Sequence, residues 1–440
     1  MLLRPLTIAS LTAVLASPGL LPMLASEEDA SPPSSSAQGE TGKMVLDNES
    51  VWHLARQQAY AVTAAKAALD ATKADRGDAM SPFRPQVNAG LSWRRYGDRP
   101  VGPGGMTGDR HSYQGQITLE QSLLTFGRRY HVHRITRNLI EGAHIELLGA
   151  ERDAALRALA ALESYRFAVA TRTVAQQRVE QRQGELSDAE KLFEVGNVRM
   201  LDVRQSRINL SAAQDNLVFT EAEVASARSD LLSALALEQH QAVSIDDALT
   251  RPGNLEAAIS HARSRIEDNI DLRGLEQSRR ILRQQANLEL TQAKPSLSGV
   301  LGYGYGGDRL NDMRDEWYVG INAQWRLLDG GGRYARRSSL LANERRVGIQ
   351  QDALINERQR ELAVIQAESA ALAARIELQE SVVADTEQNY EDARVLYQTG
   401  EITLTRVGEA GLAVSEAQFN LNRYRFEESV LAHRLRALSE

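Results

Sequence analysis

The residue types that most readily suggest chemistry in this chain are a histidine pair and a glycine-rich run. His131 and His133 could hint at a metal, but residues two apart on a helix point to different sides, and no carboxylate stands close enough to complete a site. Gly302, Gly304 and Gly306 resemble a phosphate-binding loop, yet no Lys-Ser/Thr pair follows them. The sequence therefore predicts no catalytic residue, no cofactor and no metal site, and an enzyme is not expected.

Composition narrows the classes of function further. The 440 residues carry a formal net charge of -7, so a nucleic-acid partner is not expected. The chain has no cysteine, which excludes disulfides, thiolate metal sites and a cysteine nucleophile. It also lacks the cysteine that N-terminal lipid anchoring of a bacterial protein requires.

The N-terminal segment 1–26 has the pattern of a secretory signal peptide. Arg4 supplies the positive start, and residues 6–15 form a short apolar core. A membrane anchor is the alternative, but Pro18 and Pro22 interrupt the run before it reaches the ~20 apolar residues of a spanning helix. The interpretation is a secreted chain whose first 26 residues are removed.

Four later segments alternate between apolar and polar residues, with the period of two that is typical of strands. In the first segment, Val87, Leu91 and Trp93 alternate with polar neighbours. Strands of roughly ten such residues are typical of membrane-spanning hairpins, although a hairpin on a soluble domain shows the same pattern. The predicted strands cover about 84–96, 112–125, 295–306 and 316–328, and they hold the expected membrane-interface aromatics Trp93, Tyr113, Trp317 and Trp325.

Very long helices are expected after each pair of strands. Residues 126–195 and 333–399 contain no proline and are dense in Ala, Leu, Glu, Gln and Arg, which are strong helix formers. A helix of that length runs about 100 Å at the usual rise per residue. Such lengths exceed those of globular helices and indicate a coiled-coil-like element.

These elements occur twice. The strand exits 123–129 and 327–333 are 204 residues apart, and the helix-breaking Gly196 and Gly400 are also 204 residues apart. Two landmarks with one offset indicate an internal duplication. The expected organisation is a disordered linker over 27–46, a first repeat over 47–240, a connector over 241–253 and a second repeat over 254–440.

The strand count has a consequence for assembly. Four strands cannot close a barrel, and an open sheet edge in hydrocarbon leaves backbone groups unsatisfied. A dimer would supply eight strands and a filled lumen, whereas a trimer supplies twelve and leaves room for a conduit. The predicted fold is therefore mainly α with β. A duplicated long-helix α-barrel forms a tunnel, and four strands per protomer contribute to a 12-stranded trimeric β-barrel.

The duplicated motifs resemble those of the TolC family of outer-membrane efflux and secretion channels. The resemblance rests on the strand exits LLTFGRR and LLDGGGR and on the helix-turn motifs that begin at Phe193 and Tyr397. It implies a homotrimer in the cell outer membrane, in contact with outer-membrane lipid and with a long periplasmic extension. It also implies docking onto a periplasmic adaptor protein and an inner-membrane pump. Drug efflux and type I secretion both remain open, because the inner-membrane partner mainly selects the cargo.

The resemblance also implies roles for residues at the periplasmic tip. A Tyr–Asp bond that closes the tip would join Tyr397 to Asp202, although a helix cap is an alternative role for Asp202. The acidic ring of the family falls at Arg406 and Glu409, so the first of these positions is reversed in sign. The tip turns that would dock the adaptor are Gly196, Asn197, Gly400 and Glu401.

The sequence is also compatible with a second function. The chain could be a soluble periplasmic coiled-coil scaffold or pump adaptor, in which the two hairpins are ordinary β-modules. The tryptophans in the strands and the signal peptide favour the channel.

Overall fold

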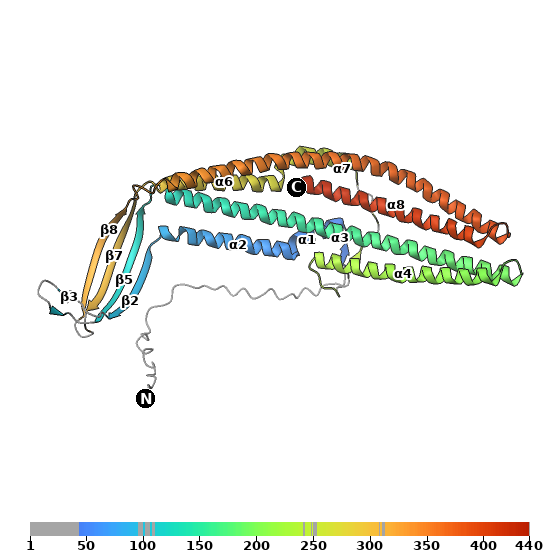
Figure 1. The fold of residues 1–440 in the computed structure, drawn as a ribbon, viewed down its shortest axis with the longest axis horizontal. Coiled ribbons are helices and arrows are strands. Elements are labelled where there is room, and N and C mark those ends of the chain that lie inside the picture. The colour runs from blue at the N-terminus through green and yellow to red at the C-terminus, as the bar shows by residue number, and fades with distance from the viewer. Residues whose placement is uncertain are drawn as a thin grey trace, which may run out of the picture. The chain divides into compact units, whose positions relative to one another are not determined.

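A computed structural model describes residues 44–95, 100–101, 106–107, 111–240, 243–247, 249, 253–307, 309 and 313–439. The predicted signal peptide and residues 27–43 of the predicted linker lie outside the described residues. The described chain is mostly helical, and a four-stranded sheet lies at one end of the helices (Figure 1). The predicted mainly α class with strands is confirmed.

The sheet contains the two predicted hairpins, joined through their inner strands. Its order is β2-β5-β7-β8, and every neighbouring pair is antiparallel. A second, two-residue pair, β3 with β4, lies in the first hairpin loop. The strands are β2 (Gln86–Arg95), β3 (Pro100–Val101), β4 (Met106–Thr107), β5 (His111–Leu124), β7 (Ser296–Gly307) and β8 (Arg314–Gln324).

The strand register sorts the side chains of the sheet onto two faces. Val87, Leu91 and Trp93 of β2 pair with Leu119, Gly115 and Tyr113 of β5, and the same row continues through β7 into β8. The middle of this face is apolar on all four strands, with Gln121 and Asp315 toward its two ends, yet it is open: Leu91 is 93% exposed. Other exposed members of this face are Ile117, Leu301, Tyr303, Trp317, Val319 and Ile321.

Each hairpin leads into a long helix through a left-handed glycine. Gly127 has a φ of 93° and Gly331 a φ of 84°, values that favour glycine because it has no Cβ. The helices that follow are α3 (Arg128–Glu194) and α7 (Gly332–Gln398), each of 67 residues. At about 1.5 Å per residue each is about 100 Å long, which confirms the predicted long elements.

A shorter helical segment precedes each hairpin, and neither segment is one continuous helix. Each is divided, at Ala59 (φ -55°, ψ 139°) and at Asn269 (φ -58°, ψ 141°). The two breaks have nearly the same conformation and are 210 residues apart. The offset is 210 before the hairpins and 204 after them, because the first hairpin is six residues longer than the second. The breaks therefore belong to the duplication. Neither is a Gly or Pro, which is why helix composition does not reveal them. The segments are α1 (Asn48–Gln58), α2 (Tyr60–Met80), η1 (Ser81–Phe83), α5 (Leu255–Arg265), η2 (Ile266–Asp268) and α6 (Ile270–Thr291).

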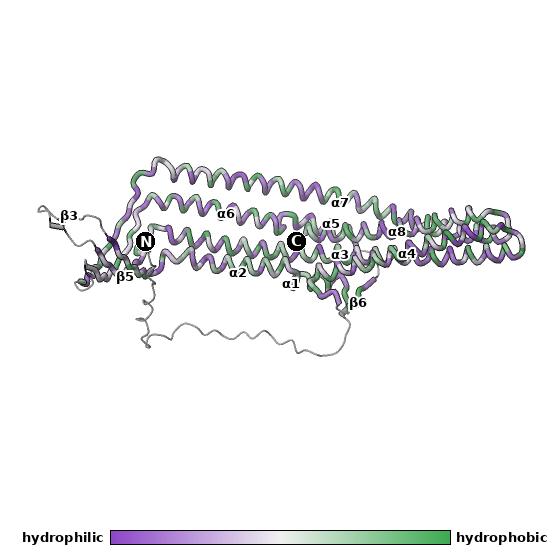
Figure 2. The backbone as a smooth tube through the Cα atoms, turned by 60° about the horizontal axis from the view of Figure 1, so that its bottom comes forward, coloured by the Kyte–Doolittle hydropathy of each residue, from purple (hydrophilic) through white to green (hydrophobic). Residues whose placement is uncertain are grey.

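The helices form a layer rather than a bundle around one axis. Next to the sheet the order of contact is α2, α3, α6 and α7. Beyond the breaks, α4 (Met200–Ala234) packs on α3, while α8 (Leu404–Ser439) lies between α3 and α7 (Figures 1 and 2). Helix α3 has neighbours on both sides, and it accordingly buries more side chains than α7.

The end of the predicted linker and the connector are partly ordered. Strand β1 (Met44–Leu46) pairs in parallel with β6 (Val243–Ile245). The placement of a disordered linker as far as residue 46 is therefore wrong for its last three residues. The physical reason is burial: the Leu46 side chain is 0% exposed and packs with Trp52, Leu159 and Leu231.

Candidate functional site

The far ends of the helical hairpins have the two glycine turns that the sequence predicts. Gly196 and Gly400 adopt φ values of 81° and 82°. In each turn the glycine N–H donates to the carbonyl oxygen three residues earlier. The N–H of the residue after the glycine donates to the carbonyl oxygen five residues before itself. These outer bonds are Asn197 N–H to Leu192 O at 2.8 Å and Glu401 N–H to Leu396 O at 2.9 Å. Both hairpin tips therefore have the same rigid helix ending.

Asp202 and Tyr397 do not form a hydrogen bond with each other within the described protomer. The Asp202 carboxylate accepts the backbone N–H of Arg199 at 3.1 Å, which is a capping contact at the start of α4. Tyr397 is 3% exposed, and its hydroxyl has no hydrogen-bond partner among the described residues. Burial first, and then the negative charges of Asp202, Asp188 and Glu185, raise the pKa of Tyr397. The phenol thus lies within electrostatic range of Asp202 and in an apolar cluster with Leu192 and Val407.

Arg406 and Glu409 form an exposed ion pair on α8. An Arg406 guanidinium nitrogen lies 3.2 Å from a Glu409 carboxylate oxygen, one turn along the helix. Glu409 also lines a groove between α3, α4 and α8 that contains Asp202 and Arg182. The two charges at these positions therefore cancel locally.

The four predicted interface aromatics lie in or beside the sheet. Trp93 and Tyr113 face each other across β2 and β5 near the hairpin loop. Trp93 Nε1 lies 3.2 Å from Nδ1 of His111, and the two rings stack. Trp317 lies opposite Tyr303, and Trp325 follows β8 at the helical end, where its Nε1 donates to the Ala293 carbonyl at 3.0 Å. Aromatic rings thus occur toward both ends of the apolar face.

Comparison with known families gives one match that covers most of the chain. Residues 51–237 and 262–438 match the model of the outer membrane efflux protein family. The chain belongs to this family. It is therefore a member of a family of outer-membrane channels rather than of enzymes, and this membership favours the channel over the scaffold or adaptor. The two matched segments correspond to the two repeats.

Solved structures with the same fold come from several bacteria. VceC from Vibrio cholerae superimposes with a TM-score of 0.73 at 18% identity, over 89% of this chain and 96% of that one. The Campylobacter jejuni CmeC outer membrane channel gives 0.72 at 15% identity, over 96% and 94%. The Neisseria gonorrhoeae MtrE outer membrane channel gives 0.69 at 13%, over 89% and 88%. No match is found among curated protein sequences.

Within the ranges that the structure describes, no helix is long and apolar enough to cross a membrane. Among those same residues, no group of three or more His, Cys, Asp or Glu side chains is placed to hold a metal ion.

Buried polar contacts near the tip were not identified from the sequence. Arg182 of α3 donates to Glu185 at 2.7 Å and to the Gly408 carbonyl of α8 at 3.2 Å. Asp188 of α3 accepts from Arg394 at 3.0 Å and from Gln398 at 2.9 Å, both on α7. In sequence these residues are charges on long helices, like many others. Only the packing of α3 against α7 and α8 shows that they connect the two hairpins.

Burial changes the acid–base properties of this region. Desolvation raises the pKa of Glu185, despite the opposing charge and hydrogen bond of Arg182. Desolvation, followed by the nearby Glu185 charge, raises the pKa of Tyr390. Both side chains lie near the tip turns, where α3 packs against the helical hairpin of α7 and α8.

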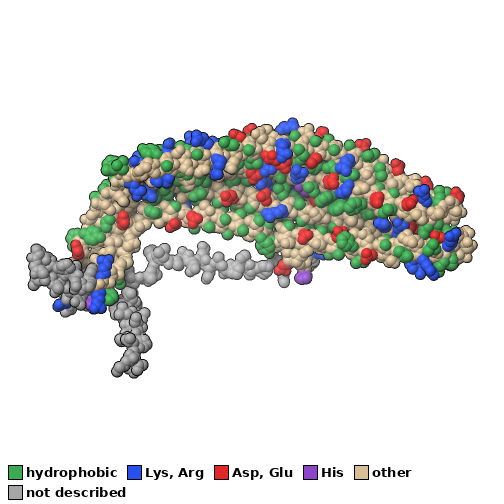
Figure 3. Space-filling model, in the orientation of Figure 1, with side chains coloured by type: hydrophobic (Ala, Val, Ile, Leu, Met, Phe, Trp, Pro, Cys, Tyr) green, Lys and Arg blue, Asp and Glu red, His purple; other side chains and the backbone are tan. Residues whose placement is uncertain are grey.

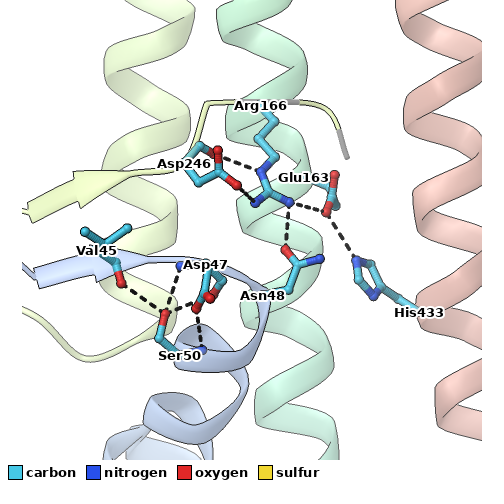
Figure 4. Close-up of polar contacts among 8 residues, drawn as sticks. All are labelled: Val45, Asp47, Asn48, Ser50, Glu163, Arg166, Asp246 and His433. Carbon is cyan, nitrogen blue, oxygen red and sulfur yellow. Dashed lines mark hydrogen bonds and ion pairs between the residues drawn. The ribbon is translucent and has the colours of Figure 1, made fainter. Parts of the chain in front are cut away.

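A second buried network lies midway along the helices, where β1 and β6 meet α3 (Figure 4). Arg166 is 1% exposed and bonds Asn48 at 2.7 Å, Glu163 at 2.9 Å and Asp246 at 3.1 Å. His433 of α8 lies 3.4 Å from Glu163. Arg166 thus joins the first helix, the connector and the long helix of the first repeat.

Proposed function

We propose that this outer membrane efflux protein is one protomer of a trimeric channel, the exit duct of a tripartite efflux pump or a type I secretion system. The observation that carries the proposal is the sheet face whose middle rows are apolar on all four strands and exposed. Exposed apolar surface of that extent needs a covering, and acyl chains provide one. The polar face on the other side of the same strands suits a water-filled lumen.

The unpaired edges of the sheet support assembly of several copies. Within the described residues, β2 and β8 each pair on one side only. If β8 of one protomer pairs with β2 of the next, three copies supply twelve strands and leave no edge. The outer helices of the layer support the same assembly, because α4 exposes Ile208, Val218 and Phe219 and α7 exposes Ile349 and Leu378.

The tip is the surface proposed to meet a periplasmic adaptor and, through it, an inner-membrane pump. Exposed apolar side chains flank both turns: Phe193, Val195 and Leu201 at the first and Val395 and Leu396 at the second. Gly196, Asn197, Gly400 and Glu401 hold these side chains on rigid turns. An adaptor with complementary apolar grooves would bury them.

The gate is proposed to involve Tyr397 and Asp202 through electrostatics and packing rather than through a direct bond. Removing both groups with Tyr397→Phe and Asp202→Ala tests this in single-channel recordings. A higher conductance of the closed state supports the role, and an unchanged closed state refutes it.

Membrane fractionation tests the function as a whole. The channel is expected as a heat-modifiable trimer in the outer-membrane fraction. A soluble periplasmic monomer would contradict the proposal.

A further inference from the structure

A basic cavity lies where the first hairpin meets its helices. Five basic side chains line it: Lys73, Arg76, Arg84, Arg129 and His133. They come from the end of α2, from the residue after η1 and from the start of α3. In the part of the chain that the structure describes, no carboxylate lines the cavity. On the face drawn in Figure 3, Lys and Arg side chains gather where the helices meet the sheet.

The basic side chains of the cavity are poorly compensated. Lys73 pairs with Asp70 at 2.8 Å. Across the ranges that the structure covers, Arg76, Arg84 and Arg129 have no ion pair. Three guanidinium groups around one cavity repel each other unless an anion lies among them.

The second repeat provides an internal comparison. With the offset of 210 before the hairpin, Lys73 corresponds to Arg283 and Arg84 to Lys294. With the offset of 204 after it, Arg129 corresponds to Arg333 and His133 to Arg337. The basic character is therefore present in both copies.

The two copies differ in their acids. In the second copy, Asp329 accepts the Arg333 backbone N–H at 2.8 Å, and Glu289 pairs with Arg336 at 2.9 Å. The corresponding positions of the first copy are Thr125 and Ala79. Helix α3 accordingly has no side-chain cap at its positive end. At these two positions the second repeat has carboxylates beside its arginines, and the first repeat has none.

The position of the cavity indicates which anion fits. Arg84 is three residues before Val87, where the apolar sheet face begins. Arg128, one residue before Arg129, lines a different pocket together with polar-face residues such as Gln86 and Glu120. Phe83 is the one residue that lines both pockets, and the described lining of the basic cavity includes no residue of the polar sheet face. Met80 and Phe83 add an apolar wall. Tyr130 beside it is exposed, as interfacial aromatics are.

We propose that this cavity binds the headgroup phosphate of an anionic phospholipid, through Arg76, Arg84 and Arg129. Guanidinium groups bind phosphate oxygens by charge-assisted, often bidentate hydrogen bonds. The acyl chains would continue along the apolar strands from Val87. The inference rests on the proposed membrane placement of the sheet.

Native mass spectrometry of the full-chain oligomer in detergent, titrated with phosphatidylglycerol, tests the site. The wild type is expected to retain the lipid, and Arg84→Gln with Arg129→Gln is expected to reduce its retention at least fivefold. The matched control is Lys294→Gln, the counterpart of Arg84 in the second copy, for which retention should stay within twofold. The charge-preserving pair Arg84→Lys and Arg129→Lys should retain most of the binding.

Three outcomes would overturn the inference. Equal retention by all variants would show that the lipid binds elsewhere. Equal retention of phosphatidylcholine would show that the cavity does not recognise the net negative charge of the lipid headgroup. Displacement of phosphatidylglycerol by an equal concentration of inorganic phosphate would identify a free-phosphate site instead. Outer-membrane fractionation of the wild type is scored separately, because its failure would contradict the proposed function, whereas loss of lipid retention alone concerns only this cavity.

Discussion

At the scale of single residues, the tip contains two kinds of polar group with different roles. Tyr397 has a buried hydroxyl that finds no hydrogen-bond partner among the residues described, whereas Asp188 uses one carboxylate oxygen for both Arg394 and Gln398. Satisfied charged hydrogen bonds stabilise a contact, and an unsatisfied hydroxyl costs free energy. The contact between α3 and α7 therefore depends more on Asp188 than on the Tyr397 hydroxyl.

Asp188→Asn is predicted to loosen the contact between α3 and α7. The neutral amide weakens two hydrogen bonds to a side chain that is largely buried, which removes about 1–2 kcal/mol. Closed-state conductance in planar bilayers should rise several-fold. Asp392→Asn is the control, since Asp392 only accepts from Gln388 on the exposed surface of the same helix. An equal effect of both variants would contradict the role of Asp188.

Asp47 is predicted to contribute a pH-dependent cap to α1. The Ser50 hydroxyl and then the Ser50 backbone N–H lower the pKa of Asp47. A lowered pKa in the folded state means that the stabilisation is present above the ordinary aspartate value and is lost as the pH falls through the folded value. Asp47→Ala should cost about 1 kcal/mol at pH 7 and less near pH 3, measured by urea unfolding in detergent. The exposed Asp70→Ala serves as the control, with a change below about 0.5 kcal/mol.

At the scale of elements, the duplication is visible in the sequence and governs the fold. The glycines at the strand exits and tips, the absence of proline and the alternation of the strands predict α3, α7 and the four-stranded sheet. The division at Ala59 has no local signal, whereas Asn269 caps α6 with its side chain and is of a type that often starts helices. Pairing of β1 with β6 joins segments about 200 residues apart, and three-residue strands carry too little pattern to be found.

The same limit applies to the candidate site. The turns at Gly196 and Gly400 follow from residue type, because only glycine adopts their conformation easily. The contacts of Arg182 and Asp188 depend on how α3 packs against α7 and α8, and no spacing along one helix encodes that packing. The ion pair between Arg406 and Glu409 is different, because its three-residue spacing on one helix is a local feature.

Alanine substitutions at a junction glycine and at a glycine inside α3 are predicted to have opposite effects on stability. Gly127→Ala should destabilise the protein by about 1 kcal/mol or more, because its positive φ strains any Cβ. Gly142→Ala should stabilise it by up to about 1 kcal/mol, because Gly142 lies inside α3 with room for a methyl group beside Gln277. Urea midpoints of the two variants measure both effects. A shift of both in one direction would contradict the assignment of strain to the junction.

At the scale of the whole molecule, the two faces of the sheet divide the environment into an apolar and a polar side. Leu91 and Ser92 are neighbours in β2 and point to opposite faces. Leu91→Arg places a charge on the proposed lipid face, which costs about 2–4 kcal/mol near the bilayer midplane. It should reduce the yield of folded oligomer in the outer membrane more than tenfold. Ser92→Arg should assemble normally and alter conductance only, and comparable yields of the two variants would contradict the proposed orientation.

Disulfide cross-linking tests most directly whether three protomers close the sheet through β2 and β8. The chain has no cysteine, so introduced pairs report only the intended contact. Asn88→Cys on β2 is combined in turn with Gly320→Cys, Asn322→Cys or Gln324→Cys on β8, and the chains are oxidised in membranes and separated under denaturing conditions. If β2 of one protomer pairs with β8 of the next in a trimer, at least one combination gives a covalent ladder that ends at three chains. Only monomer in every combination, or a ladder that ends at two or runs past three, would contradict it.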